Sequence, residues 1–279
     1  MSRHRKRPQP RSAARSQFQT FATVLTSEIR KVLLVQWSYR FNAWFALLSE
    51  VVGFLGAVFL VGGGQPSQAL IASSALGYIV TSYARHLVTA LVADLRNEGR
   101  AGTLEQMHMT VTPMDVPILG NMIAIFIVAT IRLAIIILGL ILFFRLQLPF
   151  RWESVVVLAI TFVGLAGVGY LAAGLLDILK QTKTIVLSMT LLLSFVNGAY
   201  LTLEHMPSGL AFVARFLPTT QGIVVLRRVT LEGASLTDVF MDGSLIFLMV
   251  HSVALLILGR FVFLWGENVA RERALLGQY

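Results

Sequence analysis

The sequence has no cysteine, and only 13% of its 279 residues are charged. The absence of cysteine excludes a disulfide framework and a thiolate metal site. The low charge excludes an ordinary soluble domain, in which roughly a quarter of the residues are charged. With 56% hydrophobic residues and a mean hydropathy of +0.75, the chain carries more apolar surface than one soluble core can bury. The composition therefore predicts that lipid is the main solvent of this protein.

Sequence motifs for catalysis are also missing. No GxxxxGK[ST] loop occurs, since the run Gly62-Gly63-Gly64 is followed by Gln65-Pro66 and contains no lysine. HExxH and GxSxG are absent, and so is a strand followed by a glycine-rich turn and a helix. The five histidines stand singly, and no two of them share a ligand spacing: His4, His86, His108, His205 and His251. We therefore predict no catalytic residue, no metal site and no cofactor bound by this chain.

Long apolar runs dominate the rest of the sequence. A helix needs about 20 mostly apolar residues to cross a bilayer. The runs lack the alternation of a membrane β-barrel, so they predict helices. The fold class predicted is an all-α integral membrane protein with six transmembrane helices. These predicted spans are residues 41–62, 68–92, 118–144, 154–177, 184–203 and 244–266.

The basic residues are distributed unevenly between the two sides. Fifteen of the 23 Lys and Arg residues fall on the side of the N-terminus, and five fall on the other side. Because cytoplasmic loops carry the excess of positive charge, both termini are predicted to be cytoplasmic, in a multi-pass protein of the cell inner or plasma membrane. The net charge of +9 is then explained by anionic lipid headgroups near the span ends, and no nucleic acid is expected as a partner.

One segment before the first span is predicted to be helical. Residues 17–40 are amphipathic and precede a span directly, which favours a helix lying in the membrane interface; a soluble helix packed on a partner is the alternative.

Residues 1–16 are interpreted as a disordered basic cytoplasmic arm, 17–266 as one permease domain and 267–279 as a cytoplasmic tail.

The outer stretch 204–243 is too long for a bare loop, and its two apolar runs are too short to cross the membrane. They predict short re-entrant helices that end at Pro218 and Gly233. Arg227 and Arg228 in this stretch could bind lipid phosphate or could hold a helix end at the interface.

Charged residues inside spans are costly, so they usually face protein or water. Glu50 and Arg85 lie at similar depths, and we predict that they pair, as a structural lock rather than a substrate contact. Arg132 has no obvious partner, and it is the candidate for contacting an anionic substrate group; an interhelical hydrogen bond is the alternative. Asn197 and His251 favour interhelical hydrogen bonding over ligand binding.

Small residues form a stripe along the fourth span. Its glycines predict close packing against another helix, either of this chain or of a second copy: Gly164, Gly167, Gly169 and Gly174.

One inner segment resembles a known signature. Glu98, then Gly102-Thr103-Leu104-Glu105-Gln106, then Thr112-Pro113 is similar to the E…GTLEQ…TP pattern of type 2 ATP-binding-cassette (ABC) exporter permeases. Residues 216–236 resemble the segment that this family carries between spans 5 and 6. Leu119-Gly120 matches the start of the family's third span, although Asn121 stands where lysine is common.

The resemblance implies how the protein works. It implies a permease dimer, homo- or heteromeric, docked on separate cassette ATPase subunits that bind ATP and Mg²⁺. The coupling segment would include Glu98, Gly102, Thr103, Leu104, Glu105, Gln106, Met107 and Pro113. The function implied is export of an amphipathic, drug-like or lipid-like substrate. Export of a lipid-linked polysaccharide and ion-driven secondary transport are the alternatives.

Overall fold

The computed structural model describes residues 10–102, 115–179, 188, 190, 196–200 and 206–272. In these ranges the chain is all-helical, and it contains no strand. Its helices, in chain order, are α1 (Pro10–Ser38), α2 (Arg40–Val61), α3 (Gln68–Arg100), α5 (Asp115–Phe144), α6 (Trp152–Leu179), α8 (Ser208–Arg215), α9 (Pro218–Thr230), α10 (Leu236–Met241) and α11 (Ser244–Glu272).

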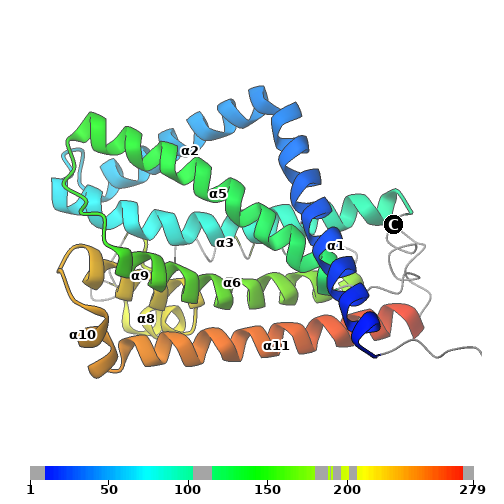
Figure 1. Ribbon diagram of the computed structural model, residues 1–279. Helices are drawn as coiled ribbons and strands as arrows, with labels where there is room; N and C mark the ends of the chain where they lie inside the picture. Colours follow the sequence, from blue (N-terminus) through cyan, green and yellow to red (C-terminus); the bar gives the residue numbers. More distant parts are fainter. Residues whose placement is uncertain are drawn as a thin grey trace, which may run out of the picture.

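The long helices form a bundle around α3. In Figure 1, α3, α6 and α11 run side by side, and α5 and α1 cross their upper face. Helices α8, α9 and α10 cover one end of the bundle, and α9 packs on both α3 and α6. The first residues of α1 and the last residues of α11 lie toward the opposite end. The described ends of the chain are therefore on the same side of the bundle.

Four of the described helices are long and apolar enough to cross a membrane, namely α2, α5, α6 and α11. They agree with the predicted spans 41–62, 118–144, 154–177 and 244–266. Helix α3 is not among them, and it carries Arg85 and His86 as well as polar residues on buried faces, such as Ser74, Thr81 and Ser82. The predicted span 184–203 lies mostly outside the described residues, so the count of six spans stays a prediction.

Helix α1 is longer than the predicted interfacial helix. It begins at Pro10, within the stretch predicted to be disordered, and it ends at Ser38. Proline is favoured at the first position of a helix, where its missing N–H costs nothing, which explains a start at this residue. Only Tyr39 separates α1 from α2, so the chain turns a corner there.

Helices α6 and α11 meet along a line of glycines. A Cβ atom added to Gly164 would lie 2.9 Å from Oγ of Ser252, and one added to Gly174 would lie 2.7 Å from Cα of Phe263. A Cβ on Gly259 would overlap the carbonyl oxygen of Gly167. The glycine stripe of the fourth predicted span therefore packs against a helix of the same chain. The exception is Gly169, which faces the methyl group of Met122 on α5.

The chain bends sharply between α8 (Ser208–Arg215) and α9 (Pro218–Thr230). The axes of α8 and α9 differ by 92°, which fits either a broken span or a re-entrant loop. Pro218 is the first residue of α9 rather than the end of the preceding helix. Gly233 follows α9 with a φ of +75°, a conformation that glycine adopts without steric cost. Ser235 and Asp238 then form a capping box that starts α10.

Candidate functional site

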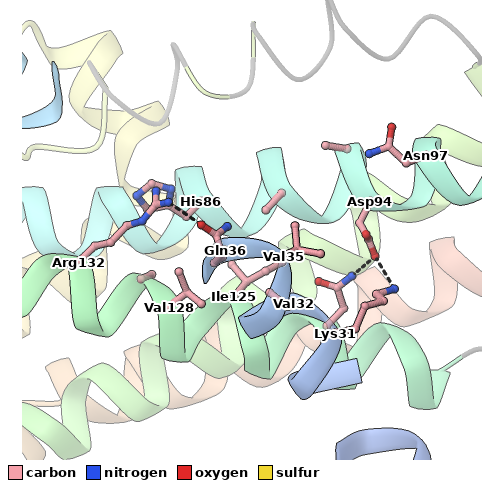
Figure 2. Close-up of a pocket in the computed structure, with 14 residues that line it drawn as sticks. Lys31, Val32, Val35, Gln36, His86, Asp94, Asn97, Ile125, Val128 and Arg132 are labelled. Atoms are coloured by element: carbon pink, nitrogen blue, oxygen red, sulfur yellow. Dashed lines mark hydrogen bonds and ion pairs between the residues drawn. The ribbon is translucent and has the colours of Figure 1, made fainter. Parts of the chain in front are cut away.

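A polar pocket of about 250 Å³ lies between α1, α3 and α5 (Figure 2). Its polar residues gather at two ends: Lys31 and Asp94 lie at one end, and His86 and Arg132 lie at the other. Aliphatic side chains separate the two ends, among them Val32, Val35, Ile125 and Val128. Helix α1 forms one wall of the pocket because it packs directly on α5. A Cβ atom added to Gly120 of α5 would lie only 3.1 Å from Cβ of Glu28 on α1.

The ammonium group of Lys31 holds the first end together. Its Nζ lies 2.9 Å from Glu28, 3.4 Å from Asp94 and 3.1 Å from Glu98. Asn121 of α5 donates a hydrogen bond to the same Asp94 carboxylate. Burial alone would lower the pKa of Lys31, but hydrogen bonds to Glu28 and Glu98 and the charges of Asp94 and Glu28 raise this pKa well above its ordinary value. Lys31 is therefore protonated at neutral pH, and it ties α1 to the end of α3 that precedes the predicted coupling segment.

Arg132 defines the second end. Its guanidinium donates a hydrogen bond of 2.9 Å to the side-chain oxygen of Gln36. The sequence offered no partner for Arg132 because Gln36 belongs to the amphipathic helix, which was expected to lie in the interface. The structure lays that helix against α5, so the partner comes from nearly one hundred residues away in the chain.

Glu50 and Arg85 are linked indirectly. The Glu50 carboxylate lies 3.1 Å from Nε2 of His86, the neighbour of Arg85. The hydroxyl of Tyr78 donates to Glu50 over 3.4 Å and accepts from Arg85 over 3.5 Å. The Arg85 guanidinium also lies 5.8 Å from the centre of the Tyr78 ring. The predicted direct pair is thus replaced by a bridge through Tyr78, with His86 as the direct partner of Glu50.

A second pocket of about 300 Å³ adjoins the first, between α1, α2 and α5. The two pockets share Gln36, Val128 and Arg132. The hydrogen bond between Gln36 and Arg132 therefore belongs to the wall that separates a polar pocket from a largely apolar one. Sequence reasoning selected Arg132 and missed Gln36, whose only signal was an amide on the amphipathic helix.

The two adjacent arginines of α9, Arg227 and Arg228, have different contacts. Arg227 turns inward and donates to the backbone carbonyl of Ser73 over 3.1 Å and to that of Ala199 over 2.7 Å. Arg228 lies in ion pairs with Asp242 and, at 3.9 Å, with Glu232, and it donates to Ser244. Arg227 thus ties α9 to α3 and to the turn at residue 199, and Arg228 ties the end of α9 to the junction between α10 and α11.

Asn197 and His251 have different surroundings. Asn197 is fully buried in a non-helical turn and donates to the hydroxyl of Thr81 on α3 over 2.6 Å, so the bond joins that turn to α3 rather than one helix to another. His251 on α11 is half-buried, and its ring lies 5.7 Å from that of Phe247.

The predicted coupling residues lie mostly outside the described residues, namely Thr103, Leu104, Glu105, Gln106, Met107 and Pro113. Gly102 lies at the end of α3 with a φ of +69°, which permits a turn there. Glu98 is bound to Lys31 of its own chain, and a contact of Glu98 with an ATPase subunit stays a prediction.

A comparison with known protein families shows to which family the chain belongs. Residues 63–261 match the model described as ABC-2 family transporter protein. The chain belongs to the ABC-2 family. The match starts at the end of α2 and reaches into α11, so it covers α3, the polar pocket's α5 wall and the outer helices. No curated protein matches the sequence.

Membership fixes the general role of the chain. An ABC-2 permease is the membrane subunit of an ABC transporter. The several apolar helices agree with a multi-pass membrane protein. Helix α1, which supplies Lys31 and Gln36 to the pocket, lies before the matched region.

Proposed function

We propose that this ABC-2 permease exports an amphipathic, drug-like or lipid-like substrate, with ATP and Mg²⁺ bound by a separate cassette ATPase subunit. The observation that carries the proposal is the pair of adjoining pockets, one polar and one apolar, that meet at Arg132. A molecule with a polar head and an apolar tail fits such a pair. The polar pocket offers hydrogen-bond partners to the head, and the apolar pocket accommodates the tail.

The topology proposed has six spans. Helix α3 would be a span in addition to α2, α5, α6 and α11, since its polar residues face protein rather than lipid, and residues 184–203 would supply the sixth. Both termini would be cytoplasmic in the cell inner or plasma membrane, and α8 and α9 would be re-entrant on the outer side. The partners would be the ATPase subunit and a second permease chain.

The proposed route of coupling starts at the inner end of α3. Nucleotide-driven closure of the ATPase subunits would move the segment from Gly102 to Pro113, which follows α3 directly. Lys31 binds Asp94 and Glu98 near that end of α3, so the movement would also reach α1 and the pocket that α1 lines. The pocket would then change shape with the ATPase cycle.

The test is co-expression of the chain with the cassette ATPase encoded beside its gene, followed by ATPase assays of the purified complex in nanodiscs. We expect the two subunits to co-purify and Glu105→Lys to detach or uncouple the ATPase. Glu232→Lys is the matched control, because it makes the same charge change at an exposed site beyond α9. Failure of any ATPase to associate, together with solute movement by the chain alone down an ion gradient, would overturn the proposal in favour of a secondary transporter.

A further inference from the structure

The apolar pocket contains an unbalanced positive charge. Its described lining includes Arg40 and Arg132 but no Asp or Glu. The remaining lining residues are apolar or neutral: Leu33, Gln36, Trp37, Ala43, Trp44, Leu47, Val128, Ile131 and Ile135. A half-buried guanidinium such as that of Arg132 is costly beside apolar side chains unless an anion neutralises it, and the exposed Arg40 adds a second positive charge to the same groove. The composition of the groove therefore points to an anionic ligand that also has an apolar part.

Both arginines have donors to spare for such a ligand. Among the described residues Arg40 forms no ion pair or hydrogen bond, and its guanidinium lies 5.4 Å from the centre of the Phe41 ring. Arg132 uses one N–H group on Gln36, and a guanidinium has five in all. Planar guanidinium groups bind phosphate oxygens in pairs of hydrogen bonds. One phosphate between the two arginines would satisfy donors from α5 and from the corner between α1 and α2.

The apolar wall of the groove is open to the surroundings. Trp37 is 73% exposed and Trp44 is 62% exposed, although both line the groove. In a membrane protein such faces meet lipid, and Trp rings concentrate at the depth of the headgroups. The neighbouring polar pocket fits an anion less well, because the Asp94 carboxylate lines it and both Asp94 and Glu98 already pair with Lys31.

We propose that the groove between α1, α2 and α5 is a binding site for an anionic phospholipid of the leaflet that contains α1. The phosphate lies between Arg40 and Arg132, and an acyl chain follows the wall formed by Leu47, Ile131 and Ile135. Net negative charge on the lipid gives the selectivity, since a zwitterionic headgroup would bring its own cation close to the two arginines. A second protein helix is disfavoured as the occupant because an apolar helix would leave both charges unpaired.

Tryptophan quenching tests this site directly. The chain has four tryptophans, and the double variant W152F/W265F leaves Trp37 and Trp44 as the reporters. This variant is placed in nanodiscs that contain either brominated phosphatidylglycerol in unlabelled phosphatidylcholine or brominated phosphatidylcholine in unlabelled phosphatidylglycerol. The two lipids are compared at equal bromine content. We expect the brominated anionic lipid to quench at least about twofold more strongly, because the groove concentrates it next to both rings.

The matched variants decide the outcome. The anionic preference should disappear in R40Q/R132Q and should persist in Arg145→Gln, which removes one positive charge from an exposed site outside the groove. Arg40→Gln alone should weaken the preference, and because Arg40 is exposed and unpaired among the described residues, this variant keeps the fold. Equal quenching by the two lipids in the parent, or an unchanged preference in R40Q/R132Q, would overturn the proposal. The assay needs neither ATP nor an ATPase, so its failure is distinct from failure of the proposed export function.

Discussion

Arg132 on α5 donates a 2.9 Å hydrogen bond to Gln36 on α1, and this contact is part of the wall between the two pockets. The contact fastens α1 to the middle of α5, at the opposite end of the polar pocket from the ion pairs of Lys31. A residue chosen for its unusual charge in a span thus lies where a polar pocket meets an apolar one.

Arg132→Gln should weaken the response of the transporter to anionic amphiphiles. Loss of one charge-assisted hydrogen bond costs about 1.5–3 kcal/mol, so the apparent affinity should fall roughly 10- to 100-fold. The measurement is ATPase stimulation of the co-purified complex by an anionic and by a neutral amphiphile of equal chain length. Gln36→Ala serves as the comparison, because it removes the interhelical bond but keeps the positive charge, and should retain the anionic preference. A loss of equal size for the neutral amphiphile in Arg132→Gln would contradict an anion-binding role.

Tyr78 should carry the coupling between Glu50 and Arg85. A double-mutant cycle of Glu50→Gln and Arg85→Gln, followed by thermal unfolding in nanodiscs, should give an interaction free energy of about 0.5–3 kcal/mol. In a Tyr78→Phe background the hydroxyl bridge is missing, and this interaction free energy should fall close to zero. If it is unchanged in that background, the two residues interact without the bridge. Tyr83→Phe is the control, since the hydroxyl of Tyr83 lies 2.9 Å from that of Thr130 instead.

Gly259→Ala should destabilise the fold, whereas Gly139→Ala should not. A Cβ at residue 259 would overlap the Gly167 carbonyl, and overpacking of this kind costs about 1–3 kcal/mol. A Cβ at residue 139 meets nothing within 4 Å, and alanine is the better helix former. Thermal unfolding of the two purified variants checks this pair. Equal stability would mean that α6 and α11 separate more readily than their contact suggests.

Arg227→Met should destabilise the protein more than Arg228→Met. Arg227 satisfies the carbonyls of Ser73 and Ala199, and loss of hydrogen bonds to a charged group costs about 1.5–3 kcal/mol. Arg228 is part of partly exposed ion pairs with Asp242 and Glu232, and ion pairs near the surface typically contribute at most about 1 kcal/mol. The two substitutions are adjacent and remove the same side chain, so denaturant or thermal unfolding compares them without further controls. The reverse order would show that the outer ion pairs carry the stability of α9.

The sequence predicted the elements well where hydropathy alone decides the structure. Long apolar runs placed α2, α5, α6 and α11 within a few residues, because lipid leaves helix as the one choice for such runs. The glycine stripe predicted a close helix contact, but only the tertiary arrangement shows that α11 is the partner.

Side-chain partners were harder to predict because they depend on which face of a helix is presented. Depth placed Glu50 at the level of Arg85, yet the direct partner is His86, which points about 100° away around α3. Gln36 and Arg227 show the same limit: a one-dimensional sequence does not reveal that α1 lies on α5 or that α9 packs against α3. The identification of a permease did not depend on these partners.

The glycine line between α6 and α11 has a mechanical consequence. Two helices that contact each other only through flexible side chains can slide past each other. The backbones of α6 and α11 touch at Gly167 and Gly259, so no flexible side chains lie between them there. Helices α6 and α11 should therefore move as one rigid body, with α9 and α10 attached at one end. A force applied at the far end of the pair would move α9 and α10 with it, and the least rigid contacts between helices would be those that α2 makes with α3 and α5, where few residues meet.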